Sequence, residues 1–232
     1  MGVVVPLRQT QGQAVGVQLR PYQDEAIAGL RQTWAAGNLL ALLVIATGGG
    51  KTITALTQVA AALRRGHRVL WLTHRSELAK QTRGSFSKLW PDLAGHAGIV
   101  KAAQDDVDRP FVIGSIDTLY NEARLARYRE HGDPTLVVVD EAHLSMAPKW
   151  MRVMQPLADT GAYFLGLTAT PHRADGVSLG TFWTLAHTIP YARLVAEGHL
   201  VPFRHQVCRL PALDLSEVRT SGGDYREGEL SE

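Results

Sequence analysis

The sequence predicts an α/β protein in which helices cover both faces of a parallel sheet. Two observations lead to this fold. Short apolar runs alternate along the chain with segments of helical periodicity, which is the pattern of strand–helix–strand units. The runs themselves, such as LLALLVIA at residues 39–46, are continuously apolar, as expected of strands that are buried on both faces.

The predicted elements follow one another in order along the chain. The segment LRPYQDEAIAGLRQTWAAGN predicts a first helix, because Pro21 suits a first helical turn and Gly37 is a common stop signal. Apolar runs then predict strands at 39–46, 69–73, 111–115, 136–140 and 163–168. Helical spacing predicts helices at 51–65, 76–89, 116–129 and 148–158, and the C-terminal part adds a helix at 191–197 and a strand at 201–209.

Composition and charge set broad limits on the function. The chain has 232 residues, of which 45% are hydrophobic and 20% are charged, with a net charge of +2. These values are typical of a globular chain, and the mild positive charge permits nucleic-acid binding without requiring it. The single cysteine, Cys208, excludes an internal disulfide and is consistent with a reducing cytoplasm. No apolar run reaches the length of a membrane span, so we expect a cytoplasmic protein without a membrane partner.

The stretch VIATGGGKT predicts a phosphate-binding turn between the strand at 39–46 and the following helix. Bare glycine backbone lets several N–H groups converge at the positive end of a helix dipole, where they can bind phosphate. Lys51 adds an ammonium group, and the Thr52 hydroxyl is placed to ligate Mg²⁺. The strict pattern G-x-x-x-x-G-K-[ST] is not met, because Ile45 occupies the first glycine position. On this fragment alone, a glycine-rich turn with a chance Lys-Thr pair is the alternative.

Two adjacent carboxylates, Asp140 and Glu141, follow the apolar strand at 136–140 in the sequence DEAH. Ligands of open parallel sheets bind at the carboxyl ends of the strands, so this pair is expected near the glycine-rich turn. Asp140 would hold Mg²⁺ through its hydration shell, and Glu141 would orient or deprotonate the attacking water. An exposed acidic turn after a core strand is the alternative interpretation.

The strand at 163–168 ends in the sequence TATP, which begins at Thr168. Small hydroxylated residues at this strand end could sense the γ-phosphate and relay its presence to neighbouring loops. Taken alone, the same residues are better explained as a strand that leads into a proline-terminated turn.

Six segments together resemble a known family. In order, they are LRPYQDEAI, ATGGGKT, VLWLTHRSELAKQ, VIGSIDTL, VVVDEAHLS and GLTATPHRADG. They resemble the N-terminal RecA-like lobe of the superfamily-two helicases, the DEAD/DEAH-box group of P-loop NTPases. Within this group they are most similar to bacterial and phage DNA helicases of the RadD-like kind and to restriction-enzyme motor subunits. The resemblance covers about residues 19–210, and many members of the superfamily share the departure at Ile45.

The resemblance implies a role for each motif around ATP. In RPYQ, Tyr22 would pack on the adenine and Gln23 would read its edge through two hydrogen bonds, with help from Arg20. His143 would connect the nucleotide site to Thr168 and Thr170 and so couple hydrolysis to movement. The phosphates and Mg²⁺ would be bound, and hydrolysis catalysed, by Thr47, Gly48, Gly49, Gly50, Lys51, Thr52, Asp140, Glu141 and His143.

The resemblance also implies a nucleic-acid interface built from strand ends. Short polar side chains and backbone amides at such ends suit phosphates better than base edges, so binding should be largely independent of sequence and sensitive to salt. DNA is favoured over RNA by the subgroup resemblance. The residues expected to contact the nucleic-acid backbone are Thr73, His74, Arg75, Ser115 and Thr118.

Two functions remain open at this point. The chain is either the ATP-binding lobe of a DNA-dependent ATPase, a helicase or translocase, or a stand-alone module that binds ATP and nucleic acid with little turnover. Too few residues follow Pro171 for a second RecA-like lobe, which needs well over about 100 residues. We expect a flexible lead-in at 1–18, the ATP-binding lobe at 19–210, and a linker or tail at 211–232 toward an absent second lobe. A small-molecule kinase would not account for DEAH followed by TATP.

Overall fold

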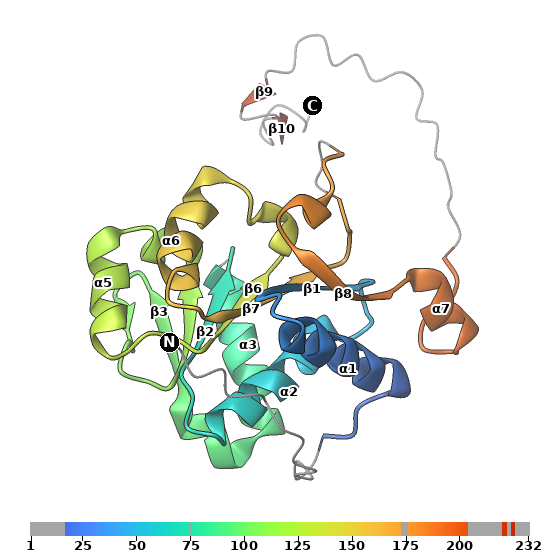
Figure 1. The fold of residues 1–232 in the computed structure, drawn as a ribbon, viewed down its shortest axis with the longest axis horizontal. Coiled ribbons are helices and arrows are strands. Elements are labelled where there is room, and N and C mark those ends of the chain that lie inside the picture. Colours follow the sequence, from blue (N-terminus) through green and yellow to red (C-terminus); the bar gives the residue numbers. More distant parts are fainter. Residues whose placement is uncertain (1–16, 75, 173–175, 204–219, 222–223, 226–232) are drawn as a thin grey trace, which may run out of the picture. The chain divides into compact units, whose positions relative to one another are not determined.

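The computed structural model describes residues 17–74, 76–172, 176–203, 220–221 and 224–225, and these form two compact units, Met1–Leu200 and Val201–Glu232 (Figure 1). The first unit is built on an eight-stranded sheet with the strand order β4-β3-β5-β2-β6-β7-β1-β8. Neighbouring strands are parallel throughout, apart from β4, which runs antiparallel to β3 at one edge. The predicted α/β fold with a largely parallel sheet is confirmed.

The strands of this sheet are β1 (Leu40–Ile45), β2 (Val69–Thr73), β3 (Ala97–Lys101), β4 (Gln104–Asp105), β5 (Phe111–Ser115), β6 (Leu136–Asp140), β7 (Tyr163–Thr168) and β8 (Thr184–Ile189). The α-helices are α1 (Pro21–Ala35), α2 (Lys51–Leu63), α3 (Ser76–Leu89), α4 (Ile116–Leu119), α5 (Glu122–Glu130), α6 (Pro148–Ala158) and α7 (Tyr191–Ala196). Short 3₁₀ helices are η1 (Pro91–His96), η2 (Ala142–Leu144) and η3 (Leu179–Thr181).

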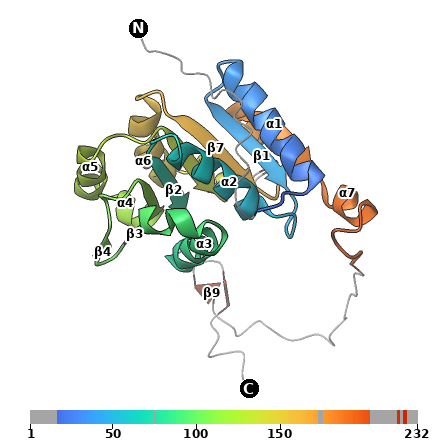
Figure 2. The same cartoon turned by 90° about the horizontal axis from the view of Figure 1, so that it is seen from below.

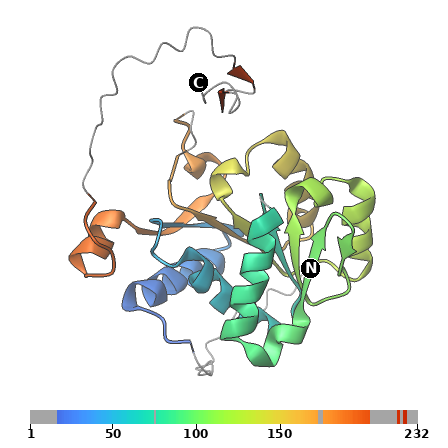
Figure 3. The same ribbon diagram turned by 180° about the vertical axis from the view of Figure 1, so that it is seen from behind.

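Burial on both faces explains the continuously apolar strands. In β1, Leu43 and Ile45 pack into one hydrophobic cluster, whereas Leu42 and Val44 pack into the other. Helices α1, α2 and α3 cover the first face and lie side by side across it, and α4, α5 and α6 cover the second (Figures 1, 2 and 3). Each strand residue therefore meets a helix layer, and a polar position would leave a buried group without water.

The sequence prediction located most of the elements. The five predicted strands and the helices at 51–65, 76–89, 148–158 and 191–197 are all present, with bounds that differ by at most two residues. The single helix predicted at 116–129 is wrong. Two helices, α4 and α5, form instead, because the Asn121 side chain accepts a hydrogen bond from the backbone N–H of Arg124 (3.3 Å) and starts a new helix there.

Three strands of the eight-stranded sheet were not predicted. β8 lies at an edge of the sheet and half of its residues are exposed, so its sequence TLAHTI lacks an apolar run. β4 forms the opposite edge and has only two residues. Edge strands need little burial, and hydrophobicity is therefore a poor guide to them. β3 lies between β4 and β5 and is mostly buried, but its apolar run, AGIVK, is short and contains a glycine.

Because the strands are parallel, the carboxyl ends of several strands lie at the same end of the sheet. β6 lies between β2 and β7, and β7 lies between β6 and β1. The last residues of β2 and β5, Thr73 and Ser115, are direct partners in the ladder, and Asp140 of β6 is paired with Leu167 of β7. The motif residues that follow these strands consequently lie at the same end of the sheet, where the strands have their carboxyl ends.

In the second unit, β9 (Thr220–Ser221) and β10 (Asp224–Tyr225) form an antiparallel pair. Of the strand predicted at 201–209, residues 201–203 have no strand structure and the others lie outside the described residues. Most of the predicted lead-in at 1–18 and most of the predicted tail at 211–232 also lie outside them. Across the described ranges, no helix has the length and apolarity that a membrane crossing requires.

Candidate nucleotide-binding site

The glycine-rich turn joins the end of β1 to the start of α2. Gly48 and Gly50 both have φ of +83°, a left-handed conformation that side chains disfavour, and Gly50 is the N-cap of α2. The backbone N–H of Gly49 bonds to the carbonyl of Ala46 (2.9 Å) and closes the turn. The first N–H groups of α2, beginning at Lys51, have no carbonyl of their own helix to bond and are available to an anion.

Tyr22 and Gln23 of helix α1 hold this turn from outside. The Tyr22 hydroxyl donates to the carbonyl of Gly49 (3.2 Å), and Nε2 of Gln23 lies 3.5 Å from the carbonyl of Gly50. A Cβ atom on Gly50 would lie 2.5 Å from this Nε2, so the amide group occupies the space that a side chain would need. Arg20 completes the contact, since Oε1 of Gln23 accepts its backbone N–H (2.9 Å).

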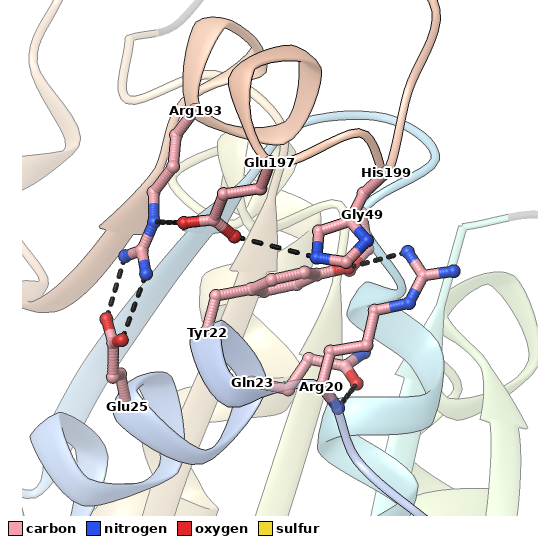
Figure 4. A network of polar contacts seen from close by, with 8 residues as sticks. All are labelled: Arg20, Tyr22, Gln23, Glu25, Gly49, Arg193, Glu197 and His199. Atoms are coloured by element: carbon pink, nitrogen blue, oxygen red, sulfur yellow. Dashed lines mark hydrogen bonds and ion pairs between the residues drawn. The ribbon is translucent and has the colours of Figure 1, made fainter.

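The predicted stacking of Tyr22 on adenine is not supported by its position. Its side chain is fully buried, and its ring lies 5.0 Å from the ring of His199, which covers it (Figure 4). Tyr22 anchors the turn through its hydroxyl group and also lines the adjacent pocket, and its stacking on adenine stays a prediction. Beside it, a pocket of about 310 Å³ is lined by Arg20, Gln23, Gly48, Gly50 and Ile53, among others, and lies next to the turn.

The acidic pair lies at the end of β6. Burial, and then the neighbouring Glu141 carboxylate, raise the pKa of Asp140 to about 6, whereas the Lys51 ammonium lowers it. In the sheet, β6, which ends in Asp140, is separated only by β7 from β1, which leads into the glycine-rich turn, so the two motifs follow strands that lie close together. Glu141 has a left-handed backbone (φ 57°), which is uncommon outside glycine and frequent at functional sites. Asp140 and Thr52 both carry oxygen atoms, which are the donors that Mg²⁺ prefers, and their role as metal ligands stays a prediction.

His143 connects the acidic pair to β7. Its Nδ1 lies 3.3 Å from the hydroxyl oxygen of Thr168 and 3.3 Å from Oε2 of Glu141. The Thr168 hydroxyl in turn donates to the carbonyl of Thr170 (2.9 Å) and accepts its backbone N–H (3.2 Å). These contacts form a chain of polar groups from the DEAH turn to the TATP turn.

The residues expected to contact nucleic acid lie further along the same edge, at the ends of β2 and β5. Thr73 and Ser115 are buried, so their side chains have almost no surface for a phosphate in this structure, and their direct contact with nucleic acid stays a prediction. His74 is exposed and Thr118 is half-buried, with its hydroxyl accepting the backbone N–H of Ala102 (3.3 Å). Arg75 lies outside the described residues.

Several residues at the turn could not have been found from sequence patterns. Glu25, Arg193, Glu197 and His199 form a polar network beside Tyr22 (Figure 4). Arg193 and Glu25 are separated by 168 positions, and although Glu25 lies in the first motif, LRPYQDEAI, Arg193 belongs to none of the six motifs. Only the packing of α7 against α1 and the turn brings them together.

Comparisons with known proteins agree with this geometry. Residues 16–173 match the family described as Type III restriction enzyme, res subunit. A candidate ATP-dependent helicase of Saccharomyces cerevisiae, IRC3, is 30% identical over 228 residues, which cover 92% of this chain and 32% of that protein. A 51.5 kDa protein of a Lactococcus phage is 28% identical over 179 residues, which cover 77% of this chain and 34% of that protein. The chain spans about a third of the length of these relatives.

Solved structures with the same fold are helicases and related ATPases. The Hef helicase domain of Pyrococcus furiosus superposes with a TM-score of 0.54 at 25% identity, covering 66% of this chain and 33% of that one. The UvsW helicase of bacteriophage T4 superposes with a TM-score of 0.57 at 16% identity, covering 75% of this chain and 61% of that one. At this identity the likeness shows the fold alone. The chain therefore belongs to the family of the type III restriction enzyme res subunit, and its first unit is an ATP-dependent helicase-like domain of superfamily two with a RecA-like fold.

Proposed function

We propose that the chain is the ATP-binding lobe of a DNA-dependent ATPase that acts as a helicase or translocase. The observation that carries the proposal is the meeting of two motifs at one edge of the sheet. The turn with Gly48 and Gly50 follows β1 and leads into Lys51, and the half-buried Asp140 ends β6, which only β7 separates from β1. A triphosphate with its metal ion supplies the negative and positive charges that these two halves of the site would bind.

The nucleotide would be held by groups already fixed in place. The N–H groups at the start of α2 and the Lys51 ammonium bind the phosphates, and Thr52 and Asp140 hold Mg²⁺. Glu141 orients a water molecule for attack on the γ-phosphorus and accepts its proton, while the bond to the leaving ADP oxygen breaks. Gln23 lines the pocket beside the turn and is proposed to read the adenine edge, because one N–H and one lone pair of its amide remain for a base after its contacts with Arg20 and Gly50.

The nucleic acid is proposed to be DNA and to lie along the ends of β2 and β5. The proposed contacts come from the exposed His74, from the half-buried Thr118 and from Arg75, which lies outside the described residues. The buried Thr73 and Ser115 are proposed to support them. The related ATPase core of Sulfolobus solfataricus was solved in complex with dsDNA (TM-score 0.56 at 22% identity, covering 68% of this chain and 33% of that one), and we propose the same class of ligand for this chain.

A second RecA-like lobe is proposed to complete the site, either in the same protein or in another chain. In phosphoryl transfer an arginine contributed across such a boundary changes the rate by about 10³–10⁵. The chain alone should then bind ATP and hydrolyse it slowly. If the pure monomeric chain instead shows rapid DNA-stimulated turnover, no second lobe is needed.

The alternative is a stand-alone module that binds ATP and DNA without turnover. Titration calorimetry of ATP with Mg²⁺ tests the part that both functions share, with Lys51→Ala as the variant that should lose binding and Lys88→Ala, in the last turn of α3, as the matched control. Absence of nucleotide binding by the natural sequence would remove both proposals. Addition of a purified second lobe from a relative separates them, because only an ATPase lobe should then gain turnover.

A further inference from the structure

The last ten residues of the first unit form a wall against the glycine-rich turn. This wall segment, residues 191–200, comprises α7 and the four residues that follow it, and Figure 4 shows it above the start of α1. Its end is fixed by the backbone N–H groups of His199 and Leu200, which both bond to the carbonyl of Leu194 (2.8 and 3.0 Å). The segment thus turns back toward the nucleotide site after α7.

Three side chains of the wall segment approach the turn. A Cβ atom on Gly49 would lie 2.8 Å from Cδ1 of Leu194, and one on Gly48 would lie 2.9 Å from Cδ2 of Leu200. The two leucines therefore fill the space directly beside the glycine backbone. His199 covers the ring of Tyr22, whose hydroxyl bonds to the carbonyl of Gly49. Any shift of the wall segment changes what the turn packs against.

Arg193 ties the wall segment to α1. Its Nη1 and Nη2 donate to the two oxygens of the Glu25 carboxylate (2.7 and 2.9 Å), and its Nε donates to Oε1 of Glu197 (2.6 Å). The other oxygen of Glu197 lies 3.6 Å from Nε2 of His199. One guanidinium group thus joins α1, the end of α7 and, through Glu197, the ring that covers Tyr22.

The charges of this network reinforce one another. Hydrogen bonding to Arg193 lowers the pKa of the Glu25 carboxyl, and the two carboxylates raise the pKa of Arg193. Because the groups are partly exposed, such pairs add little to the free energy of folding, whereas a two-pronged guanidinium–carboxylate contact fixes orientation well. α7 also remains attached through the buried Leu194, so the protein should fold without Arg193.

We propose that Arg193 is a positioning residue for nucleotide binding, which holds the wall segment in place and thereby keeps the glycine-rich turn in its phosphate-binding shape. The inference rests on the proposed nucleotide site. Arg193 itself would not contact the nucleotide. It would act on the glycine-rich turn through Leu194, His199 and Leu200. Nucleotide affinity should therefore depend on a residue outside all six motifs.

Titration calorimetry with ATP and Mg²⁺ tests the proposal on three variants. Arg193→Gln removes the guanidinium, Glu25→Gln removes its main partner, and Arg193→Lys keeps the charge without the two-pronged contact. We expect the first two to weaken ATP binding by about 5- to 20-fold, within the usual range for coupling between sites, and Arg193→Lys to weaken it less. Arg129→Gln is the matched control, since Arg129 makes a similar ion pair with Asp133 at the end of α5.

A double-mutant cycle separates positioning from general stability. Tyr22→Phe removes the hydroxyl that holds Gly49, and if Arg193 acts through the same turn, the double variant should lose less affinity than the sum of the single losses. The melting temperatures are measured in parallel, and DNA affinity should be unchanged.

Each outcome bears on one claim. If the natural sequence binds no ATP, the proposed function fails, and the role of Arg193 fails with it. If the natural sequence binds ATP and both Arg193→Gln and Glu25→Gln bind it as tightly as Arg129→Gln does, the proposed function stands and the positioning role is overturned. Additive losses in the cycle would also overturn it. Should Arg193→Gln fail to fold, Glu25→Gln carries the test, because it leaves the contact of Arg193 with Glu197 in place.

Discussion

His143 and Thr168 join two strands that lie side by side at the nucleotide site. Nδ1 of His143 lies 3.3 Å from the Thr168 hydroxyl and at the same distance from Oε2 of Glu141. One ring nitrogen thus faces both a carboxylate and a hydroxyl group, and its hydrogen can point at only one of them well. A rearrangement around Glu141 when ATP is bound or hydrolysed would therefore change the contact of His143 with Thr168 and, through it, the turn that follows Thr168.

Replacement of His143 by alanine should uncouple the nucleotide site from the nucleic-acid interface. In the natural sequence we expect DNA to change ATP affinity by about 5-fold or more, as is usual for coupled sites. His143→Ala should bind ATP alone nearly as well but lose most of this DNA effect. Calorimetric titrations of ATP with and without a short DNA duplex measure this effect of DNA on ATP affinity. His131→Ala, after the last turn of α5, is the control. A DNA effect of full size in His143→Ala would show that the coupling follows another route.

Replacement of Glu141 by glutamine should stop hydrolysis and leave ATP binding intact. The amide can still orient a water molecule but cannot accept its proton, and loss of a general base costs about 10²–10⁴ in rate. Single-turnover hydrolysis with the protein in excess over radiolabelled ATP is sensitive enough for a slow isolated lobe. Equal rates for Glu141→Gln and the natural sequence would mean that another group is the base.

Replacement of Asp140 by asparagine should stabilise the nucleotide-free protein, and more so at high pH. The pKa of Asp140 is raised in the folded state to about 6, so folding favours its protonated form. Its contribution to stability is therefore greatest at low pH and is lost as the pH rises from about 4 to about 6. Asp140→Asn removes the buried charge and should gain about 1–3 kcal/mol at pH 8, with a smaller gain at pH 5.

Urea unfolding at pH 5 and pH 8 measures this gain. The exposed Asp108 provides the control, since Asp108→Asn should change stability little at either pH. The same Asp140→Asn variant should lose affinity for ATP in the presence of Mg²⁺. A protein that becomes less stable at pH 8 would contradict the assignment of Asp140 as a group whose charge awaits a metal ion.

Replacement of Tyr22 by phenylalanine distinguishes an anchor of the turn from a base-stacking ring. The variant keeps the ring but loses the hydrogen bond to Gly49, which leaves a carbonyl without its partner at a typical cost of about 1–3 kcal/mol. We expect weaker binding of both ATP and GTP and a lower melting temperature. Unchanged affinity would favour a ring that acts by stacking alone.

The sequence predicted those parts of the fold and site that depend on residues close together in the chain. Continuous apolar runs identified β1, β2, β5, β6 and β7, because central strands are buried on both faces. The glycine-rich turn and the acidic pair were recognisable because their chemistry depends on adjacent residues.

The parts that escaped prediction depend on contacts between distant residues. The burial of Tyr22 results from His199, and nothing near Tyr22 in the sequence indicates that a ring from a later helix will cover it. Likewise the motifs do not indicate that Thr73 and Ser115, which are partners in the ladder at the ends of β2 and β5, are buried. The edge strand β8 was missed because partial exposure leaves no apolar signal.

The close approach of Gln23 to Gly50 also limits how this protein can evolve. The Cβ atom of an alanine at position 50 would lie 2.5 Å from Nε2 of Gln23. That alanine would also have to adopt the left-handed backbone conformation of Gly50. A lineage could accept a larger residue at position 50 only after position 23 had been shortened, and shortening it gives up a contact with the carbonyl of residue 50. Sterics therefore dictate the order in which these two positions can diverge, so descendants should not vary at position 50 alone.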